Sequence, residues 1–383
     1  MIRYAFSLGH QPHISAAEIT AVFALLNISY TVALQNTSFL FIDTEAPLDV
    51  DALIQRFGGV VAILERIPVS GDLRKQDAII ETVAAYLDAV CPEGKITFSF
   101  HNGNKTGIAI KKAVKQLGRS IRFVVPKNTA TVLHNNLVEK QSDLNIIDYE
   151  LFVTRAIQPI EAFSKRDYDR PGADSKSGML PPKLSRIMVN LSGVDPKNAT
   201  LLDPFCGSGT VLMEAAMLGF SHIVGTDISD KAVTDTKNNI AWLKEEYPSE
   251  LKQISFSYYS VDVLDLERRI DEDSVNVIVS EPYMGKALRG NEPKGAIVDQ
   301  ARVLGSLYEN AFRQFAQVLT DGGVVVFIIP QFFYRNEWIL IDCVNRIKNI
   351  GFFVEPFSDN EESLLYWRKG QHVGRAIWKF RKI

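Results

Sequence analysis

The strongest chemical signal in this 383-residue chain is a loop with two glycines that follows a short apolar run. The run ends at Asp203, and Gly207 and Gly209 follow before a helix that we expect to begin near Thr210. Glycine has no Cβ, so the backbone can turn tightly there and approach a ligand closely. Ligands of open α/β sheets bind outside the carboxyl ends of the strands. The spacing therefore predicts a ligand-binding loop.

Two further acids follow the next apolar runs. Asp227 can accept hydrogen bonds from both ribose hydroxyls of an adenosine-type ligand, and Asp262 can accept from the adenine amino group. Leu212 stands where the dinucleotide fingerprint needs its third glycine, and Asp203 would repel a pyrophosphate. A carboxylate there suits the cationic methionine end of S-adenosylmethionine, which we predict as the cofactor. The candidate cofactor-binding residues are Asp203, Phe205, Gly207, Gly209, Thr210, Asp227, Ile228, Asp262 and Val263. Alternatively, this loop is an ordinary strand-to-helix turn that binds no cofactor.

A second motif follows the fourth apolar run of this region and consists of Ser280, Glu281, Pro282 and Tyr283. Methyltransferases that modify amino groups of bases place Asp or Asn, two prolines and a tyrosine at this point. An aniline-like amine is a poor nucleophile, so hydrogen-bond acceptors must orient it while an aromatic ring stacks on the base. We expect Glu281 to supply the carboxylate, Tyr283 the ring and Pro282 a stiff loop, with Ser280 in the Asp or Asn position. Alternatively, Glu281 is a structural partner of a cation such as Lys286 or Arg289.

The elements that must position these motifs follow from the hydrophobic pattern. From residue 200 onward, apolar runs alternate with helix-like segments, which predicts a doubly wound, mostly parallel sheet with helices on both faces. Strands at 352–356 and 375–380 have no helix-length segment between them, so we expect an antiparallel pair at the sheet edge. Residues 1–157 show a mixed α/β pattern, and 158–182 resemble a linker because proline and glycine recur among charged residues.

Charge is unevenly distributed along the chain. The net charge is −3, yet residues 95–186 carry 16 Lys or Arg against eight Asp or Glu. Residues 95–127 contain no acid, and a predicted amphipathic helix at about 108–117 carries several of the cations. This pattern favours a phosphate-binding surface, although lysines on a helix are often merely solvated. The candidate RNA-binding residues are Lys105, Lys111, Lys112, Lys115, Arg119, Arg122, Lys127, Arg166, Arg170 and Lys183.

Other features narrow the class of protein. The three cysteines are far apart and the six histidines are scattered, so we expect neither a disulfide framework nor a metal site. The amino terminus has no signal-peptide pattern, and no apolar stretch is long enough to cross a bilayer. We therefore expect a cytoplasmic protein that has no membrane partner.

Taken together, these motifs resemble the archaeal and eukaryotic tRNA (guanine-10 N2) methyltransferase family, whose members carry a THUMP domain. The resemblance extends over nearly the whole chain. It rests on the runs Arg166–Pro171, Ser177–Leu184, Leu202–Thr210 and Gly370–Arg375, and on Ser120–Val124 in the region similar to THUMP.

The resemblance implies a domain order and an activity. We expect a small α/β domain at 1–50, a THUMP-like RNA-binding domain at 51–157, a linker at 158–182 and a Rossmann-like class I methyltransferase domain at 183–383. The implied reaction methylates N2 of guanine 10 in tRNA, and the Ser-Glu departure leaves the catalytic acceptor and the number of methyl groups open. We expect a monomer or weak dimer. Eukaryotic relatives use a small activator subunit, which this sequence neither requires nor excludes.

Two other functions fit the motifs alone. A DNA amino methyltransferase shares the cofactor and Pro-Tyr motifs, but it would need a target-recognition domain where this chain resembles THUMP. A non-catalytic RNA-binding homologue would keep the fold, and Ser280 in place of Asp or Asn is its main support.

Overall fold

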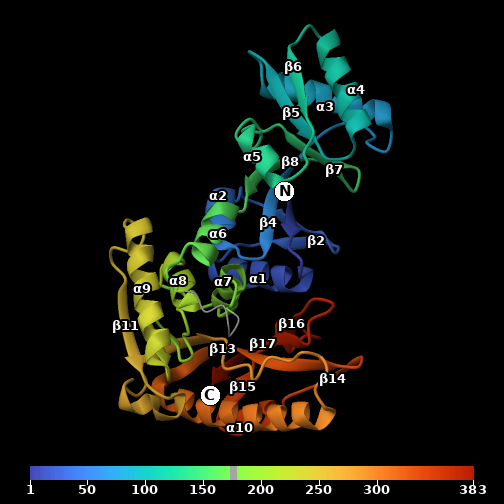
Figure 1. Cartoon of the computed structure of the whole chain (residues 1–383). Helices are drawn as coiled ribbons and strands as arrows, with labels where there is room; N and C mark the ends of the chain where they lie inside the picture. Colours follow the sequence, from blue (N-terminus) through green and yellow to red (C-terminus); the bar gives the residue numbers. More distant parts are fainter. Residues whose placement is uncertain (173–178) are drawn as a thin grey trace. The chain divides into compact units, whose positions relative to one another are not determined.

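The computed structural model describes residues 1–172 and 179–383, so Ser177 and Gly178 of the run Ser177–Leu184 lie outside the described residues. The chain forms two compact units (Figure 1). The first unit contains residues 1–12, 29–56 and 60–159. The second contains 13–28, 57–59 and 160–383, so a helix near the amino terminus belongs to the second unit.

One mixed sheet forms the frame of the first unit, in the order β2-β3-β1-β4-β8-β7-β5-β6. The strands are β1 (Ile2–Leu8), β2 (Thr31–Gln35), β3 (Phe39–Thr44), β4 (Val60–Ile67), β5 (Ile96–Phe100), β6 (Ile121–Val124), β7 (Asp143–Ile147) and β8 (Glu150–Ile157). β1 pairs with both β3 and β4, so one sheet runs across the boundary expected at residue 50. The proposed domain boundaries stay a prediction.

Four helices accompany this sheet: α2 (Val50–Arg56), α3 (Gln76–Val90), α4 (Asn104–Gln116) and α5 (Thr129–His134). α3 and α4 pack together and contact β5, where Leu87, Phe98 and Ile110 are fully buried. α4 begins four residues earlier than the sequence pattern predicts. Gly107 lies within this first helical turn against the Phe123 ring, where a Cβ would have no room.

The second unit has the doubly wound sheet that the sequence predicts, in the order β11-β10-β9-β12-β13-β17-β15. Its strands are β9 (Thr200–Asp203), β10 (His222–Asp227), β11 (Ser255–Ser260), β12 (Val275–Ser280), β13 (Leu319–Tyr334), β14 (Glu337–Ile339), β15 (Phe352–Val354), β16 (Ser363–Tyr366) and β17 (Val373–Lys382). The strands from β11 to β13 are parallel, and β17 is antiparallel to β13 and β15. The expected antiparallel pair at 352–356 and 375–380 is confirmed.

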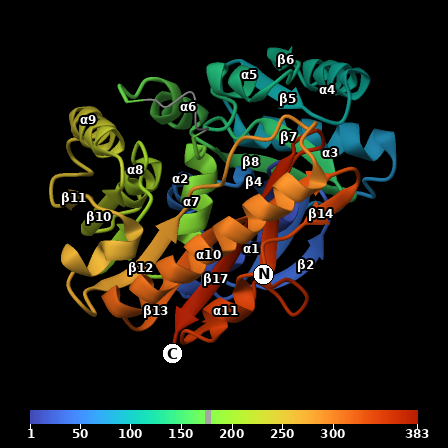
Figure 2. The same ribbon diagram turned by 60° about the horizontal axis from the view of Figure 1, so that its bottom comes forward.

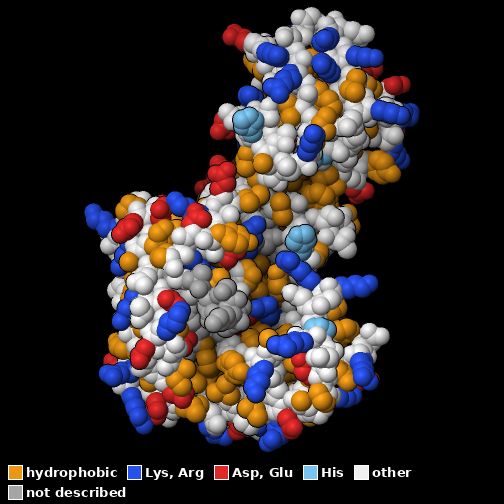
Figure 3. All heavy atoms as spheres, viewed as in Figure 1, with side chains coloured by type: hydrophobic (Ala, Val, Ile, Leu, Met, Phe, Trp, Pro, Cys, Tyr) orange, Lys and Arg blue, Asp and Glu red, His pale blue; other side chains and the backbone are white. Residues whose placement is uncertain are grey.

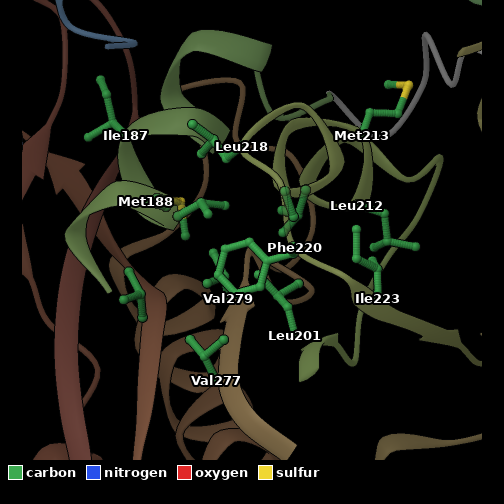
Figure 4. Close-up of a cluster of buried hydrophobic side chains, with 14 of the residues drawn as sticks. Ile187, Met188, Leu201, Leu212, Met213, Leu218, Phe220, Ile223, Val277 and Val279 are labelled. Atoms are coloured by element: carbon green, nitrogen blue, oxygen red, sulfur yellow. The ribbon is translucent and has the colours of Figure 1, made fainter. Parts of the chain in front are cut away.

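Both faces of the central strands β9, β12 and β13 are buried, which explains why these strands are largely apolar. Alternate residues face opposite layers: Leu201 lies in the cluster on one face and Leu202 in the cluster on the other. Figure 4 shows the first cluster, with Leu201, Val277 and Val279 beneath side chains of two helices. In Figure 2, the long helix α10 (Lys294–Val318) crosses the opposite face, over β13 and β17.

The remaining helices of the second unit are α1 (Pro12–Leu25), α6 (Ile160–Tyr168), α7 (Pro182–Leu191), α8 (Thr210–Met217), α9 (Asp230–Glu246), the 3-10 helix η1 (Val263–Arg268) and α11 (Val344–Lys348). α1 joins this unit through Glu18, whose buried carboxylate accepts from the Gly58 and Gly59 amides and from Asn190 of α7. No described helix combines the length and the apolar character that crossing a membrane requires.

Candidate active site

The loop between β9 and α8 has the backbone geometry that the sequence predicts. Gly207 and Gly209 adopt positive φ angles of 52° and 83°, a region that glycine enters without strain. At Gly209 a Cβ would also lie 3.0 Å from the Thr236 side chain. A larger residue at this position would therefore meet both backbone strain and a steric clash.

Side chains from α9 hold this loop by its carbonyl groups. Thr236 donates to the Gly207 carbonyl at 2.8 Å, and Asn239 donates to the Ser208 carbonyl at the same distance. Asn239 also exchanges two hydrogen bonds of 2.7 Å with the backbone of Gly172. The segment that ends at Gly172 is thereby fixed to the loop.

Three acids lie at the carboxyl ends of adjacent strands, as predicted: Asp203 and Asp227 are the last residues of β9 and β10, and Asp262 comes shortly after β11. Asp227 accepts from the amides of Gly207 at 3.0 Å and Ser229 at 2.9 Å. Asp262 caps η1 by accepting from the Leu264 amide. Because each carboxylate oxygen offers two lone pairs, both acids keep acceptor capacity for a ligand.

Asp203 differs from the other two acids because it is buried. Its Oδ1 accepts from the Phe205 amide at 3.1 Å and from the Ser280 hydroxyl at 2.6 Å. Burial raises the pKa of the Asp203 carboxyl to about 7, and the negative charges of Asp227 and Glu281 add to this shift. Asp203 therefore links the first motif to the second.

The apolar candidates divide into exposed and buried groups. Ile228 is 71% exposed beside Asp227, so its apolar side chain is open to contact. Phe205 is partly buried against Phe327, with ring centroids 6.4 Å apart. Val263 and Thr210 are buried, so their side chains support the site from beneath.

The second motif follows β12, the parallel strand beside β9. Ser280 is fully buried, and its hydroxyl proton is directed at Asp203. Pro282 is buried, whereas Tyr283 is 56% exposed and offers its ring for stacking. Tyr308 of α10 donates to the Tyr283 carbonyl at 2.8 Å and so anchors this loop.

Glu281 has a partner that the sequence analysis did not name. Its Oε1 accepts from Nε of Arg375 on β17 at 2.5 Å, rather than from Lys286 or Arg289. The side chains are only 11% and 21% exposed. Burial raises the pKa of the Glu281 carboxyl, and the positive charge of Arg375 opposes that rise.

Arg166 and Arg170, two of the candidate RNA-binding residues, are buried in the second unit, which corrects the predicted basic track at these positions. Arg166 is 2% exposed and donates twice to buried Glu214, at 2.5 and 3.3 Å. Arg170 is 3% exposed and donates to Thr210 at the start of α8. Burial lowers the pKa of the Lys183 ammonium, which lies over the Phe163 ring. Short-range sequence could not reveal these acceptors because Glu214 lies in a different helix.

The acid-free stretch forms a basic surface on α4 and β6 of the first unit, where Figure 3 shows Lys and Arg side chains gathered. Arg119 instead pairs with Asp88 and the Cys91 carbonyl, and Lys111 is half-buried. We call the exposed set the α4 surface; it comprises Lys105, Lys112, Lys115, Arg122 and Lys127. Lys105, Lys112 and Lys115 lie on one helix face, at i, i+7 and i+10.

Four supporting residues escaped the sequence analysis as site residues: Thr236, Asn239, Tyr308 and Arg375. Each acts through a contact with a residue at least 25 positions away. Of these four residues, only Arg375 could have been found from the sequence, because it is the last residue of the run Gly370–Arg375, which contributes to the family resemblance.

The fold of the whole chain is shared with a solved structure. TrmN from Thermus thermophilus superposes with a TM-score of 0.56 over the full length of both chains, at 17% sequence identity. The similarity confirms the predicted α/β architecture with a doubly wound sheet.

Sequence comparisons find named relatives over part of the chain. The chain is 33% identical over 159 residues to the tRNA (guanine(10)-N2)-dimethyltransferase of Methanothermobacter thermautotrophicus, which is 40% of each chain. It is 28% identical over 178 residues to the human U6 snRNA (guanine-N(2))-methyltransferase THUMPD2, covering 46% of this chain and 30% of that protein. The chain thus matches less than half the length of these relatives. Residues 171–333 match the family model UPF0020, described as RMKL-like, methyltransferase domain, so this part of the chain is similar to the methyltransferase domains of that family.

Proposed function

We propose that this protein transfers a methyl group from S-adenosylmethionine to the N2 amine of a guanosine in tRNA, at position 10. One observation supports the proposal: the acids at the ends of β9, β10 and β11 and the Ser280–Tyr283 motif at the end of β12 share the carboxyl edge of adjacent parallel strands. Cofactor and target base can meet at that edge. The matched relatives, one a tRNA and one a U6 snRNA enzyme by name, both methylate guanine N2.

The residues on the cofactor half fit S-adenosylmethionine. Asp227 would accept from the ribose hydroxyls, Asp262 from the adenine amine, and Ile228 would lie against the adenine ring. The negative charge of Asp203 would face the cationic methionine end. When bound, the cofactor supplies an electrophilic methyl group on a sulfonium.

The second motif would orient the amine. Glu281 and the loop carbonyls accept hydrogen bonds from N2, so that the nitrogen lone pair faces the methyl group, and Tyr283 stacks on the base. The N–C bond forms as the S–C bond breaks, and the bonding pair stays on sulfur. The surplus proton leaves nitrogen afterwards, so no strong base is needed.

The first unit would hold the RNA. The α4 surface presents exposed cations with no acid in the stretch 95–127, which suits phosphate contacts. We propose tRNA as the partner and the cytoplasm as the compartment. Position 10 and the tRNA class come from the resemblance and from the matched relatives' names.

Mass spectrometry of tRNA nucleosides from cells with and without the gene tests this function. We expect the content of N2-methylguanosine or N2,N2-dimethylguanosine to fall, and the product mass gives the number of methyl groups. Purified protein should label a tRNA transcript and not a U6 snRNA hairpin. An unchanged nucleoside profile together with no labelling of either RNA would favour the non-catalytic homologue.

A further inference from the structure

The ion pair between Glu281 and Arg375 leaves polar atoms unused. Glu281 engages Arg375 through Oε1 alone, and Arg375 engages Glu281 through Nε alone. Within residues 1–172 and 179–383, neither Oε2 of Glu281 nor the two terminal nitrogens of Arg375 make another hydrogen bond. The pair thus presents a free acceptor beside two free donor groups.

The strand register places this pair at the ligand-binding edge. Ser280, the last residue of β12, is level with Phe327 on β13. Arg375 on β17 is level with Pro330, three residues further along β13 and beyond the end of β12. The guanidinium therefore reaches across β13 to the loop that follows β12.

An acceptor beside donors complements guanine. The Watson–Crick edge of guanine carries the N2 amine, a donor, at one end and the O6 carbonyl, an acceptor, at the other. Arginine also donates through a planar fork that a lysine ammonium cannot reproduce.

We propose that Arg375 is a specificity-determining residue, which donates to O6 of the target guanine through its terminal nitrogens while its Nε holds Glu281 toward the N2 amine. This inference rests on the proposed function. It assigns base recognition to the last strand of the chain, 94 residues beyond the catalytic motif.

The test compares guanine with 2-aminopurine at the target position of a tRNA transcript, because 2-aminopurine keeps the 2-amino group and lacks O6. Single-turnover methyl transfer is measured for the parent and for Arg375→Lys. On guanine, Arg375→Lys should slow transfer about tenfold or more, as expected when a charged hydrogen bond is removed. On 2-aminopurine the same substitution should change the rate less than on guanine, because the O6 acceptor is already gone and only the contact with Glu281 is lost.

A matched control lies on the same strand. Arg381 pairs with Glu355 at 2.7 Å, at the opposite edge of the sheet, level with Val324. Arg381→Lys should leave both rates and the preference for guanine unchanged. Thermal unfolding and cofactor affinity of each variant separate folding defects from recognition.

If Arg375→Lys is unstable, the neutral double variant Glu281→Gln/Arg375→Gln is compared with Glu281→Gln alone on the two substrates. An equal loss on guanine and 2-aminopurine, or no loss on guanine, overturns the role of Arg375 and leaves the proposed function intact. Failure of the parent to methylate guanine overturns both.

Discussion

The candidate active site has two halves whose carboxylates have different partners: a cofactor half with Asp203, Asp227 and Asp262, and a catalytic half with the Ser280–Tyr283 motif. On the cofactor half, no described Lys or Arg pairs with Asp203, Asp227 or Asp262, and backbone amides and a hydroxyl are their partners. On the catalytic half, Glu281 already has a guanidinium partner. The unpaired acids are suited to a ligand that brings a positive charge and hydroxyl donors. The paired acid is suited to a neutral base, because it orients hydrogen bonds without leaving a net charge in the site.

The largest effect should come from the catalytic half. Glu281→Gln removes a positioned carboxylate acceptor and should lower turnover on the order of a hundredfold or more, with little change in tRNA or cofactor affinity. Tyr283→Ala should act likewise because the base loses its stacking partner. Ser280→Ala should cost less, since the Ser280 hydroxyl is already directed at Asp203. Single-turnover methyl transfer measures all three. If Ser280→Ala abolishes methyl transfer and Glu281→Gln leaves the rate nearly normal, the proposed roles of the two residues are reversed.

On the cofactor half, Asp227→Ala should weaken S-adenosylmethionine binding by about one to two decades. Removing charged hydrogen bonds to the ribose costs about 1.5–3 kcal/mol. Titration calorimetry of the folded variant measures the change. Glu245→Ala, an exposed acid on α9, is the control and should bind as the parent does. Equal affinity in the Asp227 and Glu245 variants would remove Asp227 from the site.

The buried acid of the cofactor half makes a prediction about pH. The pKa of Asp203 is raised to about 7 by burial, with Asp227 and Glu281 as neighbouring negative charges. A bound cation favours the ionised carboxylate, so cofactor affinity should fall about tenfold between pH 8 and pH 6, and Asp203→Asn should flatten this dependence. Proton release on binding, measured by calorimetry in two buffers, gives the same answer independently.

The same shift has a consequence for stability, with a definite sign. The protonated Asp203 is favoured in the folded state, so its stabilisation is complete below its unfolded pKa and is lost as pH rises through about 7. Asp203→Asn should therefore raise the free energy of unfolding above pH 7 and change it little under acidic conditions. Urea denaturation at pH 5 and pH 8 checks this, and equal effects at both values would contradict a raised pKa.

The same contrast explains what the sequence could predict. The loop glycines, Asp227 and Asp262 are set by strand-to-helix turns, whose partners lie nearby in the chain or on the adjacent strand, so pattern and spacing were sufficient. The partner of Glu281 depends on the pairing of β13 with β17, which no local pattern encodes. The prediction that Arg166 binds RNA was wrong for the same reason, because nothing near Arg166 in the sequence indicates the buried Glu214 that neutralises its charge.

The smallest predicted effect concerns the cations of the first unit, which contrast with the buried arginines of the second. Exposed lysines are free to release counterions when they meet phosphate, whereas Arg166 and Arg170 are not. Replacing Lys105, Lys112 and Lys115 with Gln should weaken tRNA binding modestly. It should also reduce the slope of log affinity against log salt by about 0.7–0.9 for each phosphate that the protein no longer neutralises. Lys75→Gln, an exposed lysine of the same unit outside the α4 surface, is the control for the removal of charge. Filter binding across a salt series measures both slopes, and a triple variant with the parent slope would show that α4 does not face the RNA.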